Sequence, residues 1–190
     1  MKLPGATHPV ILCTSRRQAE QAMARLRSIL GKLLLELNEE KTHIVDLRWG
    51  REGFDFLGFH LHMRRMITRP ELTALNRWPS PKACKAFRRR IKEITDRSNE
   101  GKPIADIVRE LNQVIRGWRG YFGCGQSARV FHHLDHYIRL RVAYFTGHKH
   151  KGTNRKWGRA RPLGFYYGLG LCTLGGNSTQ GGRMPVATSR

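Results

Sequence analysis

The chain has 190 residues, of which 39% are hydrophobic and 26% are charged. This composition is that of a globular protein and excludes a disordered chain, and the length allows one domain or two small ones. Lys and Arg number 35 against 14 Asp and Glu, which gives a formal net charge of +21. A charge of this sign favours a nucleic-acid partner, because each phosphate that is neutralised releases condensed counterions.

Two other classes of protein are not expected. No apolar run approaches the roughly 18 residues that a membrane-spanning helix needs, so we expect no membrane partner. The four cysteines are scattered and form no C-x-x-C pair, which fits neither a disulfide framework nor a zinc finger. This cysteine usage predicts a reducing compartment, and we expect a cytoplasmic location.

The first 63 residues are predicted to form a helix and a β-hairpin. Residues 10–13 are interpreted as a short buried strand, and Ser15 with Gln18 as a capping box that starts a helix. Residues 42–47 and 54–63 are predicted to be two strands, joined by a hairpin turn that contains two glycines. The helix carries apolar residues at helical spacing, which are expected to face a core: Ala19, Ala22, Met23, Leu26, Ile29, Leu30 and Leu33.

Residues 64–79 are basic and irregular and are interpreted as a linker, and a helical domain is predicted over residues 80–147. Ser80 caps the first helix of this domain, and Pro81 takes the first helical position. One face of the helix is apolar, with Cys84, Phe87, Ile91 and Ile94. At about 150° from it around the axis lies a second, basic face. We call this face the cationic stripe, and it consists of Lys82, Lys85, Arg89 and Lys92.

Two further helices complete a predicted three-helix bundle. Pro103 opens the second helix, and the glycines from residue 117 onward are expected to break it up. Ser127 caps the third helix, which runs to about residue 145. Residues 148–190 form a basic, Gly-rich tail without clear periodicity after Gly164, and the last 20 or so are expected to be poorly ordered. The residues expected to point inward from the second and third helices are Ile104, Ile107, Val108, Leu111, Val114, Ile115, Trp118, Val130, Leu134, Tyr137 and Ile138.

Several short motifs resemble one known family in their order and separation. Residues 35–42 read Leu-Glu-Leu-Asn-Glu-Glu-Lys-Thr and residues 54–59 read Phe-Asp-Phe-Leu-Gly-Phe. Both resemble the end of the palm of a group II intron reverse transcriptase/maturase. The helical domain is similar to that family's maturase-specific (thumb, or X) domain through Ser80-Pro81-Lys82, Leu111-Asn112, Arg116-Gly117-Trp118, Tyr121-Phe122 and Phe131-His132-His133-Leu134-Asp135.

The resemblance implies an α+β fold. Residues 1–63 correspond to a C-terminal palm remnant with a helix and a β-hairpin, residues 64–79 to a linker, and residues 80–147 to the three-helix thumb. The sequence departs from the family at Leu34, which stands about where relatives end the palm helix with glycine. It also departs after Gly164, where nothing in the family matches the tail.

The resemblance also implies that polymerase chemistry is missing. Relatives hold two metal ions at a Tyr-Ala-Asp-Asp turn just before an apolar strand, because Mg²⁺ needs carboxylate ligands at fixed spacing. If residues 10–13 are that strand, Thr7 and His8 occupy the aspartate positions, and neither replaces a carboxylate. We therefore expect no catalytic residue, no polymerase activity of the isolated chain and no bound cofactor, the Mg²⁺ being carried by RNA.

A metal site of another kind is not expected in the helical domain. His132 and His136 are one helical turn apart, but zinc needs further ligands and Asp135 points off that face. A partly charged, basic helix face is the preferred interpretation of these histidines.

The resemblance implies an RNA-binding surface on the helical domain. Its candidate residues are basic, with one aromatic residue that can stack on an unpaired base: Lys82, Lys85, Arg88, Arg89, Lys92, Arg116, Arg119, Tyr121, Arg129, Arg139 and Arg141. Trp118 and Phe122 are expected in the core instead. In the palm remnant, Phe56, Leu57, Gly58 and Phe59 match a primer-grip hairpin, with an ordinary strand as the alternative. Lys41 matches a lysine near the phosphates of the incoming nucleotide, with a simple turn lysine as the alternative.

These observations predict an RNA-binding maturase-like protein. It would bind structured group II intron RNA and assist its splicing, with a DNA target as a further partner of the ribonucleoprotein. Two alternatives remain open. The chain is the C-terminal part of a reverse transcriptase that works only with an N-terminal half, or it is a non-functional relic. The sequence makes no prediction of the oligomeric state.

Overall fold

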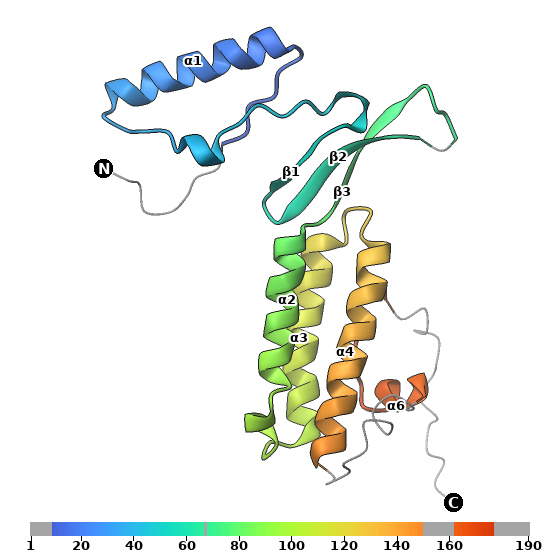
Figure 1. The fold of residues 1–190 in the computed structure, drawn as a ribbon. Coiled ribbons are helices and arrows are strands. Elements are labelled where there is room, and N and C mark those ends of the chain that lie inside the picture. Colours follow the sequence, from blue (N-terminus) through green and yellow to red (C-terminus); the bar gives the residue numbers. More distant parts are fainter. Residues whose placement is uncertain (1–8, 67, 150–161, 177–190) are drawn as a thin grey trace, which may run out of the picture. The chain divides into compact units, whose positions relative to one another are not determined.

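The structure is a computed structural model that describes residues 9–66, 68–149 and 162–176. The chain divides into two compact units, residues 1–76 and residues 77–190, which we describe separately. Helices and one small sheet are both present, which agrees with the predicted α+β class (Figure 1).

Helix α1 (Arg16–Lys32) opens the first unit and starts at the predicted residue. The Ser15 hydroxyl accepts a hydrogen bond from the Gln18 backbone N–H at 3.2 Å, which confirms the N-cap. The Gln18 side chain accepts from the backbone N–H of Thr14 at 3.0 Å, so the reciprocal bond of the capping box reaches one residue further back than predicted.

The C-terminus of α1 is a Schellman motif. The Leu35 N–H donates to the Leu30 carbonyl at 2.9 Å, and the Leu34 N–H donates to the Gly31 carbonyl at 3.1 Å. Leu34 therefore adopts a left-handed conformation with φ of 57°, which a residue with a Cβ reaches only at a cost. A glycine at this position would adopt the same conformation without that cost.

The apolar face of α1 is not a core in this structure, so its predicted burial is wrong. No residue of α1 is buried, and Ile29 and Leu33 are 55% and 62% exposed. Helical periodicity shows which face is apolar, but burial also requires another element to cover that face.

The predicted strands over residues 10–13 and 42–47 are also wrong. Neither segment belongs to a strand, and Leu12 is 84% exposed. Apolar and β-branched composition favours a strand only where a neighbouring strand supplies hydrogen-bond partners. Around the second segment the structure has two short 3-10 helices instead, η1 (Glu39–Lys41) and η2 (Arg48–Gly50).

A three-stranded sheet with the order β1-β2-β3 follows. Strand β1 (Gly53–Phe56) pairs antiparallel with β2 (Phe59–Arg65), with Phe56 opposite Phe59. The turn between them is Leu57-Gly58, with φ of 46° and 78°, the signs that a type I′ turn requires. The hairpin turn thus lies at residues 57–58 and not at the predicted residues 48–53. The predicted irregular segment 64–79 contains the end of β2 and all of β3 (Thr73–Pro79).

The second unit is a helical bundle of α2 (Pro81–Ile94), α3 (Ile104–Phe122) and α4 (Ala128–Lys149). The Ser80 hydroxyl accepts from the Ala83 N–H at 3.2 Å, which confirms the predicted cap of α2. Helix α3 continues through Gly117 and Gly120, where the sequence predicts a break, because residues 118 and 122 pack on the core and outweigh the helix propensity of glycine. The buried core side chains include Phe87, Ile91, Ile94, Ile107, Leu111, Ile115, Leu134, Ile138 and Val142.

The chain after α4 is described again from residue 162, and we call residues 162–176 the C-terminal segment. It contains helix α6 (Leu163–Gly168) and buries Tyr166, Leu171 and Leu174. The expectation of poor order concerned the last 20 or so residues, and it is wrong for residues 171–176, where Leu171 and Leu174 are buried. The remainder of that stretch, residues 177–190, lies outside the described residues.

Candidate nucleic-acid interface

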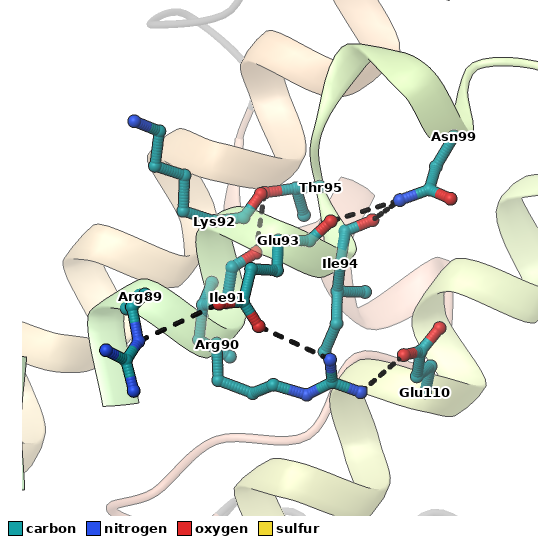
Figure 2. A network of polar contacts seen from close by, with 9 residues as sticks. All are labelled: Arg89, Arg90, Ile91, Lys92, Glu93, Ile94, Thr95, Asn99 and Glu110. Carbon is teal, nitrogen blue, oxygen red and sulfur yellow. Dashed lines mark hydrogen bonds and ion pairs between the residues drawn. The ribbon is translucent and has the colours of Figure 1, made fainter. Parts of the chain in front are cut away.

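The cationic stripe lies on the exposed face of α2, as predicted. All four of its residues are exposed, whereas Cys84, Phe87, Ile91 and Ile94 are buried on the other side of the same helix. Lys82, Lys85 and Lys92 form no ion pair within the described parts of the chain. Figure 2 shows the Lys92 side chain extending away from the carboxylates of Glu93 and Glu110. The stripe therefore presents ammonium groups to solvent at a helical repeat.

Two arginines of α2 are held by carboxylates. Arg89 Nε lies 3.7 Å from Glu93 Oε1, and both groups are more than half exposed. An exposed ion pair of this kind contributes little to stability, so Arg89 can exchange it for a contact with a phosphate. Arg90 Nη1 and Nη2 lie 3.5 Å from Glu93 Oε2 and 2.8 Å from Glu110 Oε1, respectively (Figure 2). Arg90 thereby links α2 to α3, and it is not part of the stripe.

The edge between α2 and α4 carries two more of the predicted RNA-binding residues. The guanidinium carbon of Arg88 lies 6.0 Å from the centre of the Tyr137 ring, and the Tyr137 hydroxyl donates to the Arg88 carbonyl at 3.3 Å. Arg141 donates from Nε to Thr95 Oγ1 at 3.0 Å and from Nη2 to the Thr95 carbonyl at 2.8 Å. Arg141 thus satisfies the backbone at the end of α2, so it has a structural role besides its charge.

The remaining predicted residues do not join the stripe. Glu110 marks the side of α3 that faces α2, because it is ion-paired with Arg90. Arg119 follows Glu110 by nine residues, which places it about 180° away around α3. Arg119 also lies close to Gly176 of the C-terminal segment, since a Cβ atom added at Gly176 would lie 2.7 Å from Arg119 Nη2. Arg139 lines a small cavity with Tyr166 and Tyr167 of the C-terminal segment. Arg116 and Arg129 are exposed on α3 and α4. The structure therefore gathers Lys82, Lys85, Arg88, Arg89, Lys92 and Arg141 on one side and places Arg119 and Arg139 beside the C-terminal segment.

The aromatic residues of α3 are distributed as predicted. The Trp118 ring lies 4.5 Å from the Phe87 ring and 4.3 Å from the Phe122 ring, measured between centroids, so it packs between helices. Phe122 is buried, whereas Tyr121 is 52% exposed and packs edge-on against Phe122. Tyr121 is therefore the aromatic residue of this group that is open to a base.

Two polar residues of the resembling motifs have a role that the sequence did not predict. The Asn112 amide donates to the Gly170 carbonyl and accepts from the Cys172 N–H, both at 2.8 Å. The Asp135 carboxylate accepts from the N–H groups of Leu174 at 2.8 Å and Gly175 at 3.2 Å. Both side chains are nearly buried, and they hold the C-terminal segment against α3 and α4. A buried position on an otherwise apolar helix face was the available signal, since buried polar groups need partners.

The residues of the predicted palm remnant lie in the other compact unit. Lys41 is exposed at the end of η1, and Leu57 is 67% exposed at the tip of the hairpin. Gly58 takes a positive φ in this turn, so the turn itself accounts for a glycine there. Phe56 and Phe59 are half-buried. Thr7 and His8, at the predicted aspartate positions, lie outside the described residues.

Residues 9–66, 68–149 and 162–176 contain no group of three or more His, Cys, Asp and Glu side chains that is placed to hold a metal ion. His132, His133 and His136 are exposed on α4. None of the helices that the structure describes combines the length and the apolar character needed to cross a membrane.

Comparison with known protein families finds a match within the helical unit. Residues 84–164 match the family model of the group II intron, maturase-specific domain. The match runs from the second turn of α2 through α3 and α4 to the start of α6. It confirms the resemblance to maturases that the motifs of this region indicated. No curated protein matches the chain.

Proposed function

Because residues 84–164 match the maturase-specific domain of group II introns, we propose that the chain assists the splicing of such an intron by binding its RNA. The cationic stripe is the observation that carries this proposal. It supplies exposed charge on a rigid helix whose other face is anchored in the core. Lysine and arginine at this spacing can follow a phosphate backbone.

The proposed binding mode suits folded RNA. Double-stranded RNA is recognised mainly through its shape, its phosphates and its 2′-hydroxyl groups, because side chains cannot read its deep major groove. A stripe of ammonium groups contacts phosphates without reading base sequence. The chain would stabilise the folded intron, and the RNA with its own Mg²⁺ would carry out the splicing chemistry.

We further propose that the chain has no polymerase activity of its own and binds no catalytic metal. By the order of the sequence motifs, Thr7 and His8 would stand where the resembled family has its paired aspartates, an assignment that rests on the sequence alone because residues 10–13 form no strand. Neither side chain offers Mg²⁺ a carboxylate. Mg²⁺-dependent primer extension by the purified chain would contradict this proposal.

The exposed apolar face of α1 favours one second candidate, the C-terminal part of a reverse transcriptase that needs an N-terminal half. Ile29 and Leu33 on this face are open to solvent, as expected of a surface that normally has a partner. Primer extension after mixing the chain with a separately supplied fingers and palm half of a group II reverse transcriptase distinguishes this candidate from a dedicated splicing protein.

RNA binding itself is tested by charge reversal. The variant Lys82→Glu, Lys85→Glu, Lys92→Glu removes three positive charges from the stripe. The control variant Arg17→Glu, Arg25→Glu, Lys32→Glu makes the same change in net charge on exposed positions of α1. Affinity for a labelled group II intron transcript is measured as a function of salt concentration, and splicing is measured at limiting Mg²⁺.

The stripe variant should bind much more weakly, and its log–log salt slope should fall by about 2–3, since each phosphate contact contributes about 0.7–0.9. Its stimulation of splicing should be lost in parallel. The control variant should keep most of the slope. Equal losses in the two variants would mean that net charge, and not the stripe, determines binding.

A further inference from the structure

A cleft of about 390 Å³ opens in the helical unit where α2, the 3-10 helix η3 (Arg97–Asn99) and α4 meet. Its volume falls within the range of small-molecule sites, which is about 300–1,000 Å³. The lining side chains that matter for its chemistry are Lys92, Asp96, Arg97, Glu100, Arg141 and Tyr144. Lys92 also belongs to the cationic stripe, so the cleft lies at the end of the proposed phosphate path.

Two of the charged groups in the cleft are already used by the fold. The guanidinium of Arg141 is held by the Thr95 hydroxyl and carbonyl. The Asp96 carboxylate accepts from the Ser98 N–H at 3.1 Å and the Ser98 hydroxyl at 2.9 Å, and these bonds lower the pKa of Asp96. Both groups therefore form rigid walls of the cleft.

The other four groups can face a ligand. Lys92 is exposed, and the Arg97 side chain is 81% exposed, so both can reach an anion. The half-buried ring of Tyr144 forms part of the wall. The Glu100 Oε1 atom is buried without a hydrogen bond from the described residues, and Arg97 Nε lies 3.5 Å away from it. The ion pair with Arg97 compensates part of the charge of this oxygen, and a ligand with an N–H donor would supply the hydrogen bond that the oxygen lacks.

Cations, an aromatic ring and a carboxylate match the parts of one nucleotide. Lysine and arginine bind phosphate, and tyrosine offers a surface on which a base can stack. A carboxylate only accepts hydrogen bonds, so it suits guanine best, since the N1–H and the exocyclic amino group of guanine can both donate to it, whereas uracil offers the single N3–H donor. Proteins that read RNA commonly hold a single unpaired base in this manner.

We propose that this cleft holds one unpaired nucleotide of the RNA that the chain binds. The phosphate lies between Lys92 and Arg97, the base stacks on Tyr144, and the exocyclic amino group of the base donates to Glu100. This inference rests on the proposed RNA binding and adds to it a site that selects a bulged or looped-out residue.

The test compares two hairpin RNAs that differ only in one bulged guanosine. Fluorescence anisotropy with the full chain at fixed salt should give about tenfold tighter binding of the bulged hairpin, since stacking of one base is worth a factor of this order. Replacing the bulged guanosine by uridine should remove much of the difference. Glu100→Gln should reduce the preference of guanosine over uridine, because an amide can donate as well as accept.

Glu71→Gln is the matched control, since it removes one exposed negative charge by the same replacement at a residue that belongs to the first compact unit. It should leave the ratio of the two affinities unchanged. Equal binding of the bulged and the paired hairpin by the wild-type chain would overturn the nucleotide site while leaving stripe-mediated RNA binding intact. Absence of binding to both hairpins at low salt would overturn the proposed function and the inference together.

Discussion

The anchoring of the C-terminal segment by Asn112 can be tested with the substitution Asn112→Ala. This side chain makes two hydrogen bonds of 2.8 Å with the backbone of the segment, one to the Gly170 carbonyl and one from the Cys172 N–H. Asn112 is 8% exposed, so both bonds are largely shielded from water.

The expected loss follows from these contacts. A buried hydrogen bond contributes about 0.5–1.5 kcal/mol net, and a partner left without a bond adds to the loss. Two bonds therefore predict a decrease of about 2–3 kcal/mol in the free energy of unfolding. The loss cannot exceed the free energy with which the segment docks, because beyond that point the segment would detach and its backbone would be solvated.

A double-mutant cycle separates anchoring from any effect within α3. In a background carrying Leu171→Asp and Leu174→Asp, two buried positions of the segment become charged and the segment should no longer dock. In that background, Asn112→Ala should not lower the free energy of unfolding and should raise it by up to about 0.6 kcal/mol, since alanine has a higher helix propensity than asparagine. Urea unfolding followed by circular dichroism at the helix band measures all four corners of the cycle. An equal loss in both backgrounds would refute the anchoring role of Asn112.

Two further predictions concern the core and the backbone. Phe87→Ala should lower the free energy of unfolding by about 3–5 kcal/mol, because this ring is 3% exposed and packs on Trp118. The control Lys85→Ala, on the exposed face of α2, should change the free energy of unfolding by under about 0.5 kcal/mol. Similar effects of the two substitutions in urea unfolding would show that the apolar face is not a core. Leu34→Gly should stabilise the end of α1 by about 1 kcal/mol, because the left-handed φ of 57° is unfavourable for leucine and the leucine side chain, which is 86% exposed, contributes little packing. Unchanged amide-exchange protection of α1 after this substitution would contradict that reasoning.

Local signals predicted the helices well. Ser15 and Ser80 cap the helices that they were expected to start, because an N-cap needs only a side-chain oxygen and the next three residues. Residue spacing alone predicts the two faces of α2, because a helix that packs against a core along its length carries its apolar residues on one side. The part of the candidate site formed by the cationic stripe could therefore be predicted from the sequence.

Features that depend on distant partners could not be predicted in this way. The C-terminal segment has no periodicity of its own, and it is ordered by Asn112 and Asp135, which are 39 to 60 positions away in the chain. Residues 10–13 and 42–47 have strand composition but no strand to pair with among the described residues. Arg119 and Arg139 have the right charge for RNA, but their place on the far side of α3 and beside α6 depends on how the helices pack.

The docked C-terminal segment also determines where the helical unit can be cut. The maturase-specific match ends at residue 164, but the buried side chains of Leu171 and Leu174 lie beyond it. An expression fragment that stops at the end of the match would strip an apolar cover from α3 and α4 and leave two polar anchors facing solvent. A recombinant fragment intended for crystallisation or RNA titration should therefore continue to at least Gly176, or poor solubility could be mistaken for an inability to fold.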